Sequence, residues 1–378
     1  MSGKILFFAD LHATVKHGLF GIGFVEQVEK TLTWIGQIAH EHEVDAVVFL
    51  GDVFHIQQSV DTPSLHTVTA GFRSLMKGLG NRRVRLIFIP GNHDMYRKDG
   101  EWRSTEIMRD MTDYKDAVLG DDSLIGDQYH KIKLIDAPEL VNVSDIQILA
   151  VPYSEVGYNP EPAHFVMGHL PISGAMFTPG GKPEDKGVDS SFGGFRESDP
   201  AAKEVLYVGG HYHHPQILGR SLIVGACCYH KYTDFIMPTP RGCVILTLHT
   251  PRTPTIRDFQ WIENPHTLPV HTIRKETRQE VTDEIETLRT WTSVPQERWK
   301  MRVFLPSQEL EHLEIAESEG IQLVPDDPIV AVVRLDISDT TDPTRVFDEY
   351  RSKVPPERME AEIKAIGDDF LRKAVTDG

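Results

Sequence analysis

The sequence predicts an α/β protein with one large domain built on two packed sheets, a small α+β domain after it, and a helical tail. Three observations favour this fold class. Apolar runs of strand length alternate with amphipathic segments near the start of the chain, short strands separated by turns fill its middle, and a new pattern of helices and strands begins near residue 263. The chain has 378 residues, which is enough for more than one hydrophobic core.

Strands and helices alternate over the first 90 residues. Continuous apolar runs predict strands at 4–9, 46–50 and 84–89, and apolar residues that recur every three or four positions predict helices at 25–38 and 65–79. A strand–helix–strand order requires crossover connections, and these join parallel strands. The first sheet is therefore predicted to be parallel.

The second part of the large domain consists of short strands, after a predicted helix at 104–111. The strands are predicted at 131–135, 146–151, 163–167, 205–208, 222–224, 243–248 and 255–261. Such a succession favours a second, largely antiparallel sheet that packs on the first, with helices outside. The resulting architecture has four layers in the order α/β/β/α.

The chain divides into three predicted segments. Residues 1–262 form the large domain, residues 263–340 a small α+β domain, and residues 341–378 a tail of two helices. The small domain is predicted to contain strands at 270–273, 302–305 and 329–337 and helices at 281–288 and 309–316.

Two of the predicted helices begin with local signals. Asp61 and Pro63 supply a capping carboxylate and a first-turn proline for the helix that ends near residue 79. Thr277 and Glu280 have the spacing of a capping box, in which each side chain binds the backbone N–H of the other residue.

The composition restricts the ligand class and the compartment. A formal net charge of −17 argues against a broadly basic nucleic-acid-binding surface, so a polyanionic ligand would depend on bound cations. Cys227, Cys228 and Cys243 form neither a disulfide framework nor a zinc-binding spacing, so we expect reduced thiols. No apolar run has membrane-spanning length and no signal-peptide pattern precedes the first strand, so we expect a soluble, cytoplasmic protein.

Residues that commonly bind metals follow the predicted strands of the large domain, at the points where the strands end. The motifs are Asp10-x-His12, Gly51-Asp52-x-x-His55, Gly91-Asn92-His93-Asp94, Gly168-His169 and Gly210-His211-x-His213. Open α/β sheets bind ligands at the carboxyl ends of their strands. One such motif alone is more commonly a turn or a solvated histidine, but five in succession predict a binuclear metal centre.

The spacing within these motifs predicts which side chains act together. In an extended segment, side chains two residues apart face the same way. Asp10 is thus predicted to pair with His12, and His211 with His213, so that each pair reaches one ion. Mixed His, Asp and Asn donors suit manganese or iron. Two divalent ions are expected, manganese first, with iron, magnesium and zinc as the alternatives.

The five motifs together resemble the motif set of the calcineurin-like metallophosphoesterases, over residues 1–260. The resemblance implies a bridging carboxylate at Asp52 and a residue over the phosphate, His93, that binds neither ion. It implies a first ion held by Asp10, His12, Asp52 and His213, and a second held by Asp52, Asn92, His169 and His211. Such an ion pair neutralises the phosphate and activates a water molecule, and His93 would act as general acid or as a stabilising cation. Asp94 would either orient His93 or serve a turn.

A closer resemblance, to the SbcD-type DNA repair nucleases, rests on Gly51-Asp52-x-x-His55 and on the order of the segments. In those nucleases the histidine equivalent to His55 helps to position the DNA backbone, a small α+β domain caps the phosphoesterase domain, and the final helices dock on a coiled-coil ATPase of the SbcC type. The resemblance implies a DNA exonuclease, with or without endonuclease activity, in repair and recombination. It also implies DNA and an SbcC-like ATPase as partners, and a homodimer, because the ATPase works in pairs.

Other residues are assigned by position alone. Arg97, Lys98 and Arg103 follow the Asn92-His93 loop and are candidates for substrate phosphate contacts, although a solvated loop would have the same sequence. Several further histidines have no spacing that indicates a site, and we expect them on the surface or in the core: His17, His66, His130, His164 and His230.

The sequence leaves two other functions open. A stand-alone phosphodiesterase or phosphatase that acts on small molecules or phosphoproteins would share the fold and the metals, but it would cleave small esters far faster than DNA. A binding module that keeps only the fold would have lost ligands, whereas all seven ligand candidates and His93 are present here.

Overall fold

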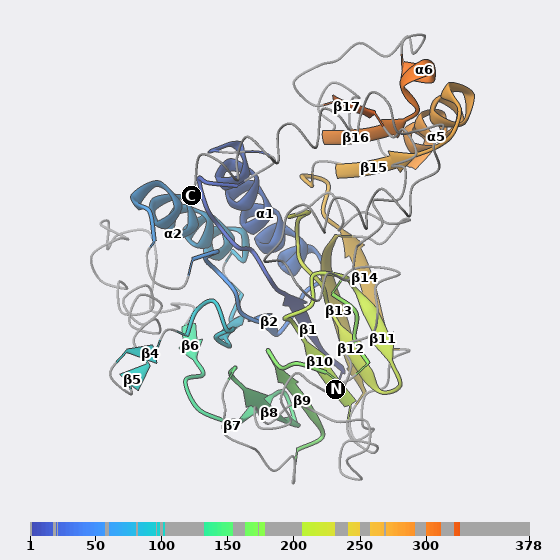
Figure 1. The fold of residues 1–378 in the computed structure, drawn as a ribbon. Helices are drawn as coiled ribbons and strands as arrows, with labels where there is room; N and C mark the ends of the chain where they lie inside the picture. The colour runs from blue at the N-terminus through green and yellow to red at the C-terminus, as the bar shows by residue number, and fades with distance from the viewer. Residues whose placement is uncertain are drawn as a thin grey trace, which may run out of the picture.

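The structure is a computed structural model. It describes residues 2–17, 20, 22–56, 60–80, 82–95, 97–98, 101–102, 132–153, 163–172, 174–177, 206–230, 241–249, 258–267, 270–291, 300–310 and 321–325. The fold consists of two six-stranded sheets, a separate three-stranded sheet and a two-stranded ribbon, with helices on the outside (Figure 1).

The first six-stranded sheet has the order β14-β13-β1-β2-β3-β6. Four strands run parallel, β1 (Ser2–Phe8), β2 (Ala46–Phe49), β3 (Arg85–Phe88) and β6 (Ile132–Leu134). Strand β13 (Gly242–His249) pairs antiparallel with β1, and β14 (Phe259–Glu263) pairs antiparallel with β13. The predicted parallel start of the chain is confirmed.

Two helices, α1 (Ile22–Glu41) and α2 (Thr62–Gly78), cover one face of this sheet. Alternate strand residues such as Phe8 and Phe49 point toward them and pack with Leu32 of α1 and Phe72 of α2 in one buried cluster. The helices form because apolar residues recur every three or four positions, and α2 begins at the predicted cap, where the Asp61 carboxylate accepts a hydrogen bond from the backbone N–H of Ser64.

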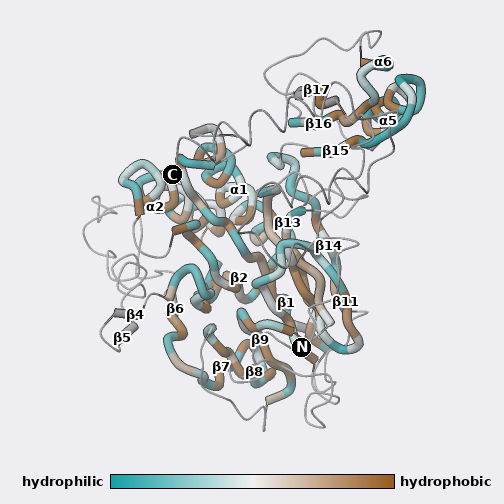
Figure 2. Tube along the Cα trace, viewed as in Figure 1, coloured by the Kyte–Doolittle hydropathy of each residue, from teal (hydrophilic) through white to brown (hydrophobic). Residues whose placement is uncertain are grey.

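The second six-stranded sheet has the order β11-β12-β10-β9-β8-β7. Its strands are β7 (Glu139–Val143), β8 (Ile146–Val151), β9 (Phe165–Gly168), β10 (Leu206–Gly209), β11 (Gln216–Leu218) and β12 (Ser221–Ile223). The two sheets pack face to face, and residues such as Phe7 of β1 and Phe165 of β9 meet in a second buried cluster. The hydropathy colouring in Figure 2 shows β13 and β9 as mainly hydrophobic.

The second sheet differs from the prediction in two respects. Strands β8, β9, β10 and β12 run parallel, where a largely antiparallel sheet was predicted. In addition, β6, β13 and β14 were expected in this sheet but pair in the first one. Both predictions were wrong because the apolar pattern of a short strand indicates that it is buried, but not which strand it pairs with or in which direction.

The fold is the predicted layered α/β arrangement, and three of the four predicted layers lie in the described part of the chain. The outer face of the second sheet carries a third cluster that includes Tyr207 and Tyr212 together with Leu170, Ile172 and Ala175. The helix predicted at 104–111 lies outside the described residues.

A three-stranded parallel sheet follows the large domain in sequence and is drawn apart from both large sheets in Figure 1. It has the order β15 (Val270–Arg274), β16 (Lys300–Leu305) and β17 (Ile321–Pro325), and the helix α5 (Arg278–Trp291) connects β15 to β16. Its own apolar cluster includes Ile285 of α5 and Val303 of β16. We call this sheet together with α5 the three-stranded unit.

The start of α5 follows the predicted capping box. The backbone N–H of Thr277 donates to Glu280 Oε2 over 3.1 Å, and the N–H of Glu280 donates to Thr277 Oγ1 over 3.4 Å. The predicted helix at 309–316 is described only as the short α6 (Ser307–Leu310), and the strand at 329–337 and the tail at 341–378 lie outside the described residues. Strand β17 was not predicted.

No helix in the described residues is long and apolar enough to cross a membrane.

Candidate metal centre

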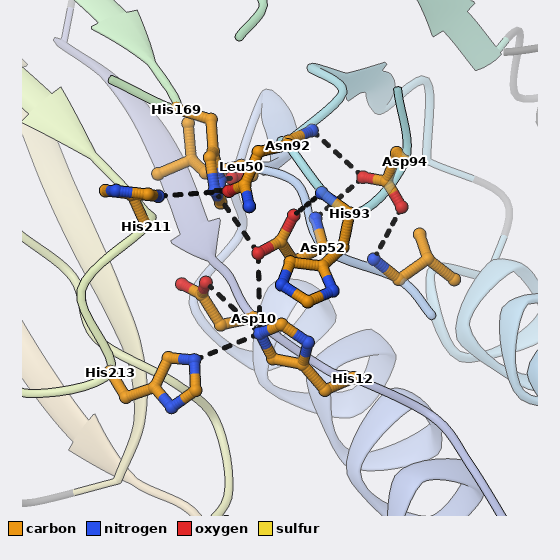
Figure 3. A network of polar contacts seen from close by, with 12 residues as sticks. Asp10, His12, Leu50, Asp52, Asn92, His93, Asp94, His169, His211 and His213 are labelled. Carbon is orange, nitrogen blue, oxygen red and sulfur yellow. Dashed lines mark hydrogen bonds and ion pairs between the residues drawn. The ribbon is translucent and has the colours of Figure 1, made fainter. Parts of the chain in front are cut away.

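The predicted metal-binding residues come together where the parallel strands of both large sheets end. Asp10 follows β1, Asp52 follows β2, Asn92 follows β3, His169 follows β9 and His211 follows β10. Figure 3 shows their side chains turned toward one another, with Asp52 in the middle. The sheet edge brings together residues that lie up to about 200 positions apart in the sequence, as the contact between His12 and His213 shows.

Backbone strain is concentrated at this edge. Six non-glycine residues of the described chain have positive φ angles, and four of them belong to the motifs: Asp10 (54°), His12 (45°), Asp52 (61°) and His211 (83°). Left-handed backbone is costly for residues with a Cβ atom and persists where the surrounding structure enforces it, most often at functional sites. The strands therefore deliver these side chains by turning sharply instead of continuing in extended form.

Glycines in the motifs permit a very close approach of the loops. A Cβ atom on Gly91 would lie 2.2 Å from Asp52 Oδ1, and one on Gly51 would lie 2.5 Å from the backbone nitrogen of Gly91. Gly51 also has a φ of 93°. Both positions require glycine because the loops after β2 and β3 pass each other here at backbone contact distance.

The Asp52 carboxylate stands between two groups of side chains. Its Oδ2 atom lies 3.4 Å from His12 Nε2 on one side and 3.4 Å from His169 Nε2 on the other. Its Oδ1 atom accepts a hydrogen bond from the backbone N–H of His93 over 2.8 Å. One oxygen is thereby fixed by the protein, and the other faces both groups, as a bridging ligand would.

The first group contains Asp10, His12 and His213, whose nearest side-chain ligand atoms all lie within 4.8 Å of one another. His12 Nε2 is 3.0 Å from His213 Nε2 and 3.8 Å from Asp10 Oδ1. The second group is centred on the Asn92 side-chain oxygen, which lies 3.1 Å from His169 Nε2 and 3.0 Å from His211 Nδ1. These groups have the composition of the two ligand sets that the resemblance implied.

The pairing of side chains two residues apart is only partly as predicted. Asp10 and His12 do belong to one group, but His211 and His213 point into different groups. That prediction assumed an extended backbone, and it was wrong for His211 and His213. Asp10, His12 and His211 all have left-handed φ angles, so the alternation of an extended strand determines neither pair.

A divalent cation fits the polar groups at this edge. Both carboxylate oxygens of Asp10 are buried, and neither has a hydrogen-bond partner among the described residues. A buried carboxylate without a partner is costly, and a bound cation removes that cost. Imidazole nitrogens, carboxylate oxygens and an amide oxygen directed at common points are suitable donors for manganese, iron or zinc.

The charges of the buried groups support the same interpretation. Burial alone would raise the pKa of Asp52, but His169 and then His12 outweigh it and hold this pKa well below its usual value. Burial would lower the pKa of His169, but Asp52 outweighs it and raises this pKa to about 9. Burial raises the pKa of Asp10 to about 6 and lowers that of His211 to about 3. A cation bound by His169 would displace its proton, so metal binding at this edge is expected to release protons.

Asp94 clamps the Asp52 loop to the Asn92 loop. Its Oδ2 atom accepts hydrogen bonds from the backbone N–H groups of Asp52 (2.7 Å) and Gly91 (3.0 Å), and its Oδ1 atom accepts one from Val53 (2.9 Å). Only 4% of the Asp94 surface is exposed. Of the two roles considered from the sequence, the described contacts correspond to the turn, because the carboxylate binds backbone amides and not the His93 ring.

His93 and His55 lie together on the side of His12. The His93 ring is 4.6 Å from the His12 ring and 5.8 Å from the His55 ring, centre to centre. His93 Nδ1 lies 2.6 Å from the backbone carbonyl oxygen of His55, so Nδ1 carries the hydrogen and donates it. The bond fixes the ring and leaves Nε2 as the nitrogen able to exchange a proton with a substrate.

The predicted phosphate contacts are described only at the level of the backbone. Arg97 lies in β4 (Arg97–Lys98), which pairs with β5 (Glu101–Trp102) in the two-stranded ribbon. Arg103 lies outside the described residues.

His230 is a neighbour of the site that we assigned from sequence to the surface or core. Its Nε2 atom lies 3.0 Å from the backbone carbonyl oxygen of Asp10, and its ring centre is 5.0 Å from that of His12 and 4.7 Å from that of His213. A signal was present in the sequence: Gly225 follows the apolar run at 222–224, as a glycine accompanies four of the five metal-binding motifs. Beyond it the chain runs beside β1, where Ala226 bridges to Ala9.

Two aromatic residues near His211 were also missed. The ring centres of Tyr153 and Phe177 lie 5.9 Å and 5.6 Å from that of His211. No spacing rule links either residue to the motifs, so the sequence offered no signal for them.

Comparisons with known proteins add the following. A family model described as calcineurin-like phosphoesterase matches residues 3–215, which is more than half of the chain. No curated protein matches the chain by sequence. Among solved structures, the chain is similar to one described as GAP50, the anchor in the inner membrane complex of Plasmodium, with 11% identity, a TM-score of 0.37, and coverage of 86% of this chain and 98% of that one.

Proposed function

The chain belongs to the calcineurin-like phosphoesterase family, and from that premise we propose that it is a manganese-dependent DNA nuclease subunit of the SbcD type. Members of this family hydrolyse phosphoesters with a dinuclear metal centre, and the chain has groups of side chains that could hold metal ions. The finer proposal is a phosphodiesterase that degrades DNA from its ends, with or without internal cleavage. Its physiological setting would be DNA repair and recombination.

In this proposal the two groups around Asp52 each hold one ion. Asp10, His12 and His213 would bind the first, Asn92, His169 and His211 the second, and Asp52 Oδ2 would be shared. A pair of divalent ions neutralises the phosphate charge, lowers the pKa of a bound water and clamps the attacking and leaving oxygens. Manganese is the first choice because the donors mix imidazole and oxygen ligands.

The protein's own groups have three tasks in hydrolysis. Asp94 keeps the Asp52 and Asn92 loops in register through its three backbone hydrogen bonds, so the ligands are positioned before substrate arrives. The His55 carbonyl orients His93 through Nδ1. His93 Nε2 would then donate a proton to the departing ester oxygen, or stabilise the charge on the phosphate oxygens.

The observation that carries the DNA proposal is the position of His55. Its ring is exposed, and it lies 5.5 Å from the His12 ring and 5.8 Å from the His93 ring, with the His55 and His93 planes within 22° of each other. An exposed imidazole at this place can contact the phosphodiester backbone next to the bond that is cleaved.

The acidic net charge restricts how DNA could bind. Residues 261–378 carry 25 Asp and Glu against 15 Lys and Arg, so a large share of the negative charge lies beyond the large domain. Metal ions would supply most of the positive field at the site. We propose an SbcC-like coiled-coil ATPase as a further partner that holds the DNA, with the C-terminal segment 341–378 as its docking element and a dimer of this chain as the working form.

The test is hydrolysis of end-labelled linear double-stranded DNA with manganese, beside bis-p-nitrophenyl phosphate, with Asp52→Ala as the blank. We expect DNA cleavage that the variant lacks. A chain that hydrolyses the small diester but leaves DNA intact even with its ATPase partner would contradict the nuclease proposal. The stand-alone phosphodiesterase or phosphatase would then be the better description.

A further inference from the structure

Phe177 is an aromatic side chain at the surface beside the candidate metal centre. Its ring centre is 5.6 Å from that of His211 and 4.8 Å from that of the buried Tyr212. Of its surface, 45% is exposed, and it is the only exposed aromatic residue among the large apolar side chains that the structure describes. A single exposed apolar residue is ordinary. Phe177 is unusual because it lies next to His211, a candidate metal ligand.

The backbone that carries Phe177 is tied to the segment that carries His211. The Gln216 carboxamide accepts from the backbone N–H of Met176 (2.9 Å) and donates to the Met176 carbonyl (2.8 Å). The Tyr212 hydroxyl accepts from the N–H of Ile172 (2.9 Å) and donates to its carbonyl (3.1 Å). Phe177 is therefore held in a fixed place relative to the metal-binding edge.

A second aromatic ring reaches His211 from a different loop. The Tyr153 ring centre is 5.9 Å from that of His211, with 32° between the planes, and 6.4 Å from that of His169. The backbone N–H of Tyr153 donates to the Pro90 carbonyl over 2.9 Å, which ties it to the loop that carries Asn92. The second group of ligands is thus flanked by two aromatic side chains.

We propose that Phe177 and Tyr153 form an aromatic subsite that binds a flat aromatic part of the substrate next to the scissile phosphate, which in DNA is the base of the esterified nucleoside. This inference rests on the proposed phosphodiesterase function and names the part of the substrate that the site recognises. Aromatic rings bind bases by stacking, which tolerates any base sequence because every base has a flat face. A net-negative protein gains from recognising the neutral base in addition to the charged phosphate.

The test compares two diesters that share one leaving group. Bis-p-nitrophenyl phosphate carries a second aromatic ester group, and methyl p-nitrophenyl phosphate carries a methyl group in its place. The variants are Phe177→Ala, Phe177→Tyr and a control, Leu140→Ala, which removes another exposed apolar side chain at β7. Bound manganese per chain is measured for each protein, as a readout that is independent of turnover.

We expect Phe177→Ala to lower kcat/KM about 5- to 100-fold on the bis-aryl diester, the range found for the loss of one stacking partner. Phe177→Tyr should restore most of this loss, and Leu140→Ala should cause none. If kcat/KM of Phe177→Ala falls only on the bis-aryl diester, the Phe177 ring contacts the ester group that is retained. If kcat/KM falls equally on both diesters, the ring contacts the leaving group. Unchanged kinetics, or a loss of bound manganese in Phe177→Ala, would overturn the subsite.

DNA separates this inference from the nuclease proposal. For the wild type, an oligonucleotide with an abasic residue beside the cleaved bond should be a poorer substrate than its intact counterpart. For Phe177→Ala, the two oligonucleotides should be cleaved at the same rate. If no protein cleaves DNA but the effect on the bis-aryl diester remains, the subsite stands and the nuclease proposal fails. If DNA and diesters are cleaved equally well by Phe177→Ala and the wild type, the nuclease proposal stands and the subsite fails.

Discussion

The contacts within the candidate metal centre join residues much farther apart in the sequence than the contacts within the three-stranded unit. At the metal centre, contacts join His93 to Asp52, His169 to Leu50 and His213 to His12, which are 41, 119 and 201 residues apart. In the three-stranded unit, the start of α5 is fixed by Thr277 and Glu280, which are three residues apart. The first arrangement exists only after both large sheets have packed, whereas the start of α5 combines the local capping box with one contact over 31 residues, from the backbone N–H of Arg278 to Glu309 Oε2.

The two regions also differ in backbone strain. Left-handed φ angles occur at Asp10, His12, Asp52 and His211 of the metal centre, and none occurs at a non-glycine residue of the described part of the three-stranded unit. Both oxygens of the Asp10 carboxylate are buried without a hydrogen-bond partner among the described residues. The helix start in the unit thus follows the local capping rules, and the metal centre departs from local backbone rules where its proposed chemistry requires it.

The largest effect is expected at the bridging carboxylate. Asp52→Ala removes the oxygen shared by both groups, so binding of both ions and hydrolysis should be lost together. His93→Ala should bind two manganese ions and lose turnover, because its ring is not part of either group. Calorimetric manganese titration and a diester assay measure the two properties. Turnover retained by His93→Ala would remove this residue from the mechanism.

The next largest effect is expected at the clamp between the loops. Asp94→Asn replaces an acceptor oxygen with an NH₂ group that faces backbone N–H donors, so a buried hydrogen bond is lost and two donors oppose each other. We expect a loss of about 1–3 kcal/mol in the free energy of unfolding and a fall of about 10- to 100-fold in manganese affinity.

The control for the clamp is the same substitution at a local cap. Asp61→Asn keeps an acceptor for the backbone N–H of Ser64, and asparagine caps helices about as well as aspartate. Urea unfolding and manganese titration of both variants test the contrast. If both substitutions changed the free energy of unfolding and the manganese affinity equally, the long-range contacts of Asp94 would matter no more than the local cap of Asp61.

A smaller and more selective effect is expected from His230. It contacts the Asp10 carbonyl and the rings of His12 and His213, all on the side of the first group. His230→Ala should weaken the first manganese site about 10-fold, at the low end of the effect of residues that orient metal ligands, and leave the second site unchanged.

The measurement for His230 is a titration that resolves two sites, with two comparison variants. His230→Gln should recover part of the affinity, because its amide can donate to the same carbonyl. His40→Ala removes another histidine next to a backbone carbonyl, that of Leu79 at the end of α2, and should change neither site. An equal loss at both sites would show that His230 supports the whole edge and not one group.

The comparison also explains how much could be predicted from sequence. The Asp61 cap, the Thr277–Glu280 capping box and the strand-end motifs were predictable because each depends on residues within a few positions. The direction of β9 and β10, and the pairing of β6, β13 and β14 with the first sheet, were not, because they depend on strands far away in sequence.

The same limit applies within the site. The residue types that gather around Asp52 could be predicted from the motifs, but the separation of His211 from His213 could not, because the backbone of these motifs is not extended. The Asp94 clamp and the place of His230 depend on contacts over 41 and 220 residues. No spacing within a motif encodes contacts of that range.

The smallest effect is expected in the three-stranded unit, where the local rule should hold by itself. Thr277→Ala removes the hydroxyl of the capping box, so the start of α5 should lose about 1 kcal/mol, and amide exchange of the first turn should rise about fivefold. Thr282→Ala is the matched control, because it makes the same change inside α5, where the hydroxyl binds only the Arg278 carbonyl and alanine is the better helix former.

Hydrogen exchange of α5 peptides and manganese titration, both on the whole chain, measure the outcome. Manganese affinity should stay the same in both variants, since no contact between described residues joins the metal centre to this helix start. A weaker metal site in Thr277→Ala alone would mean that the two regions are energetically coupled, and the contrast between local and long-range determination would then fail.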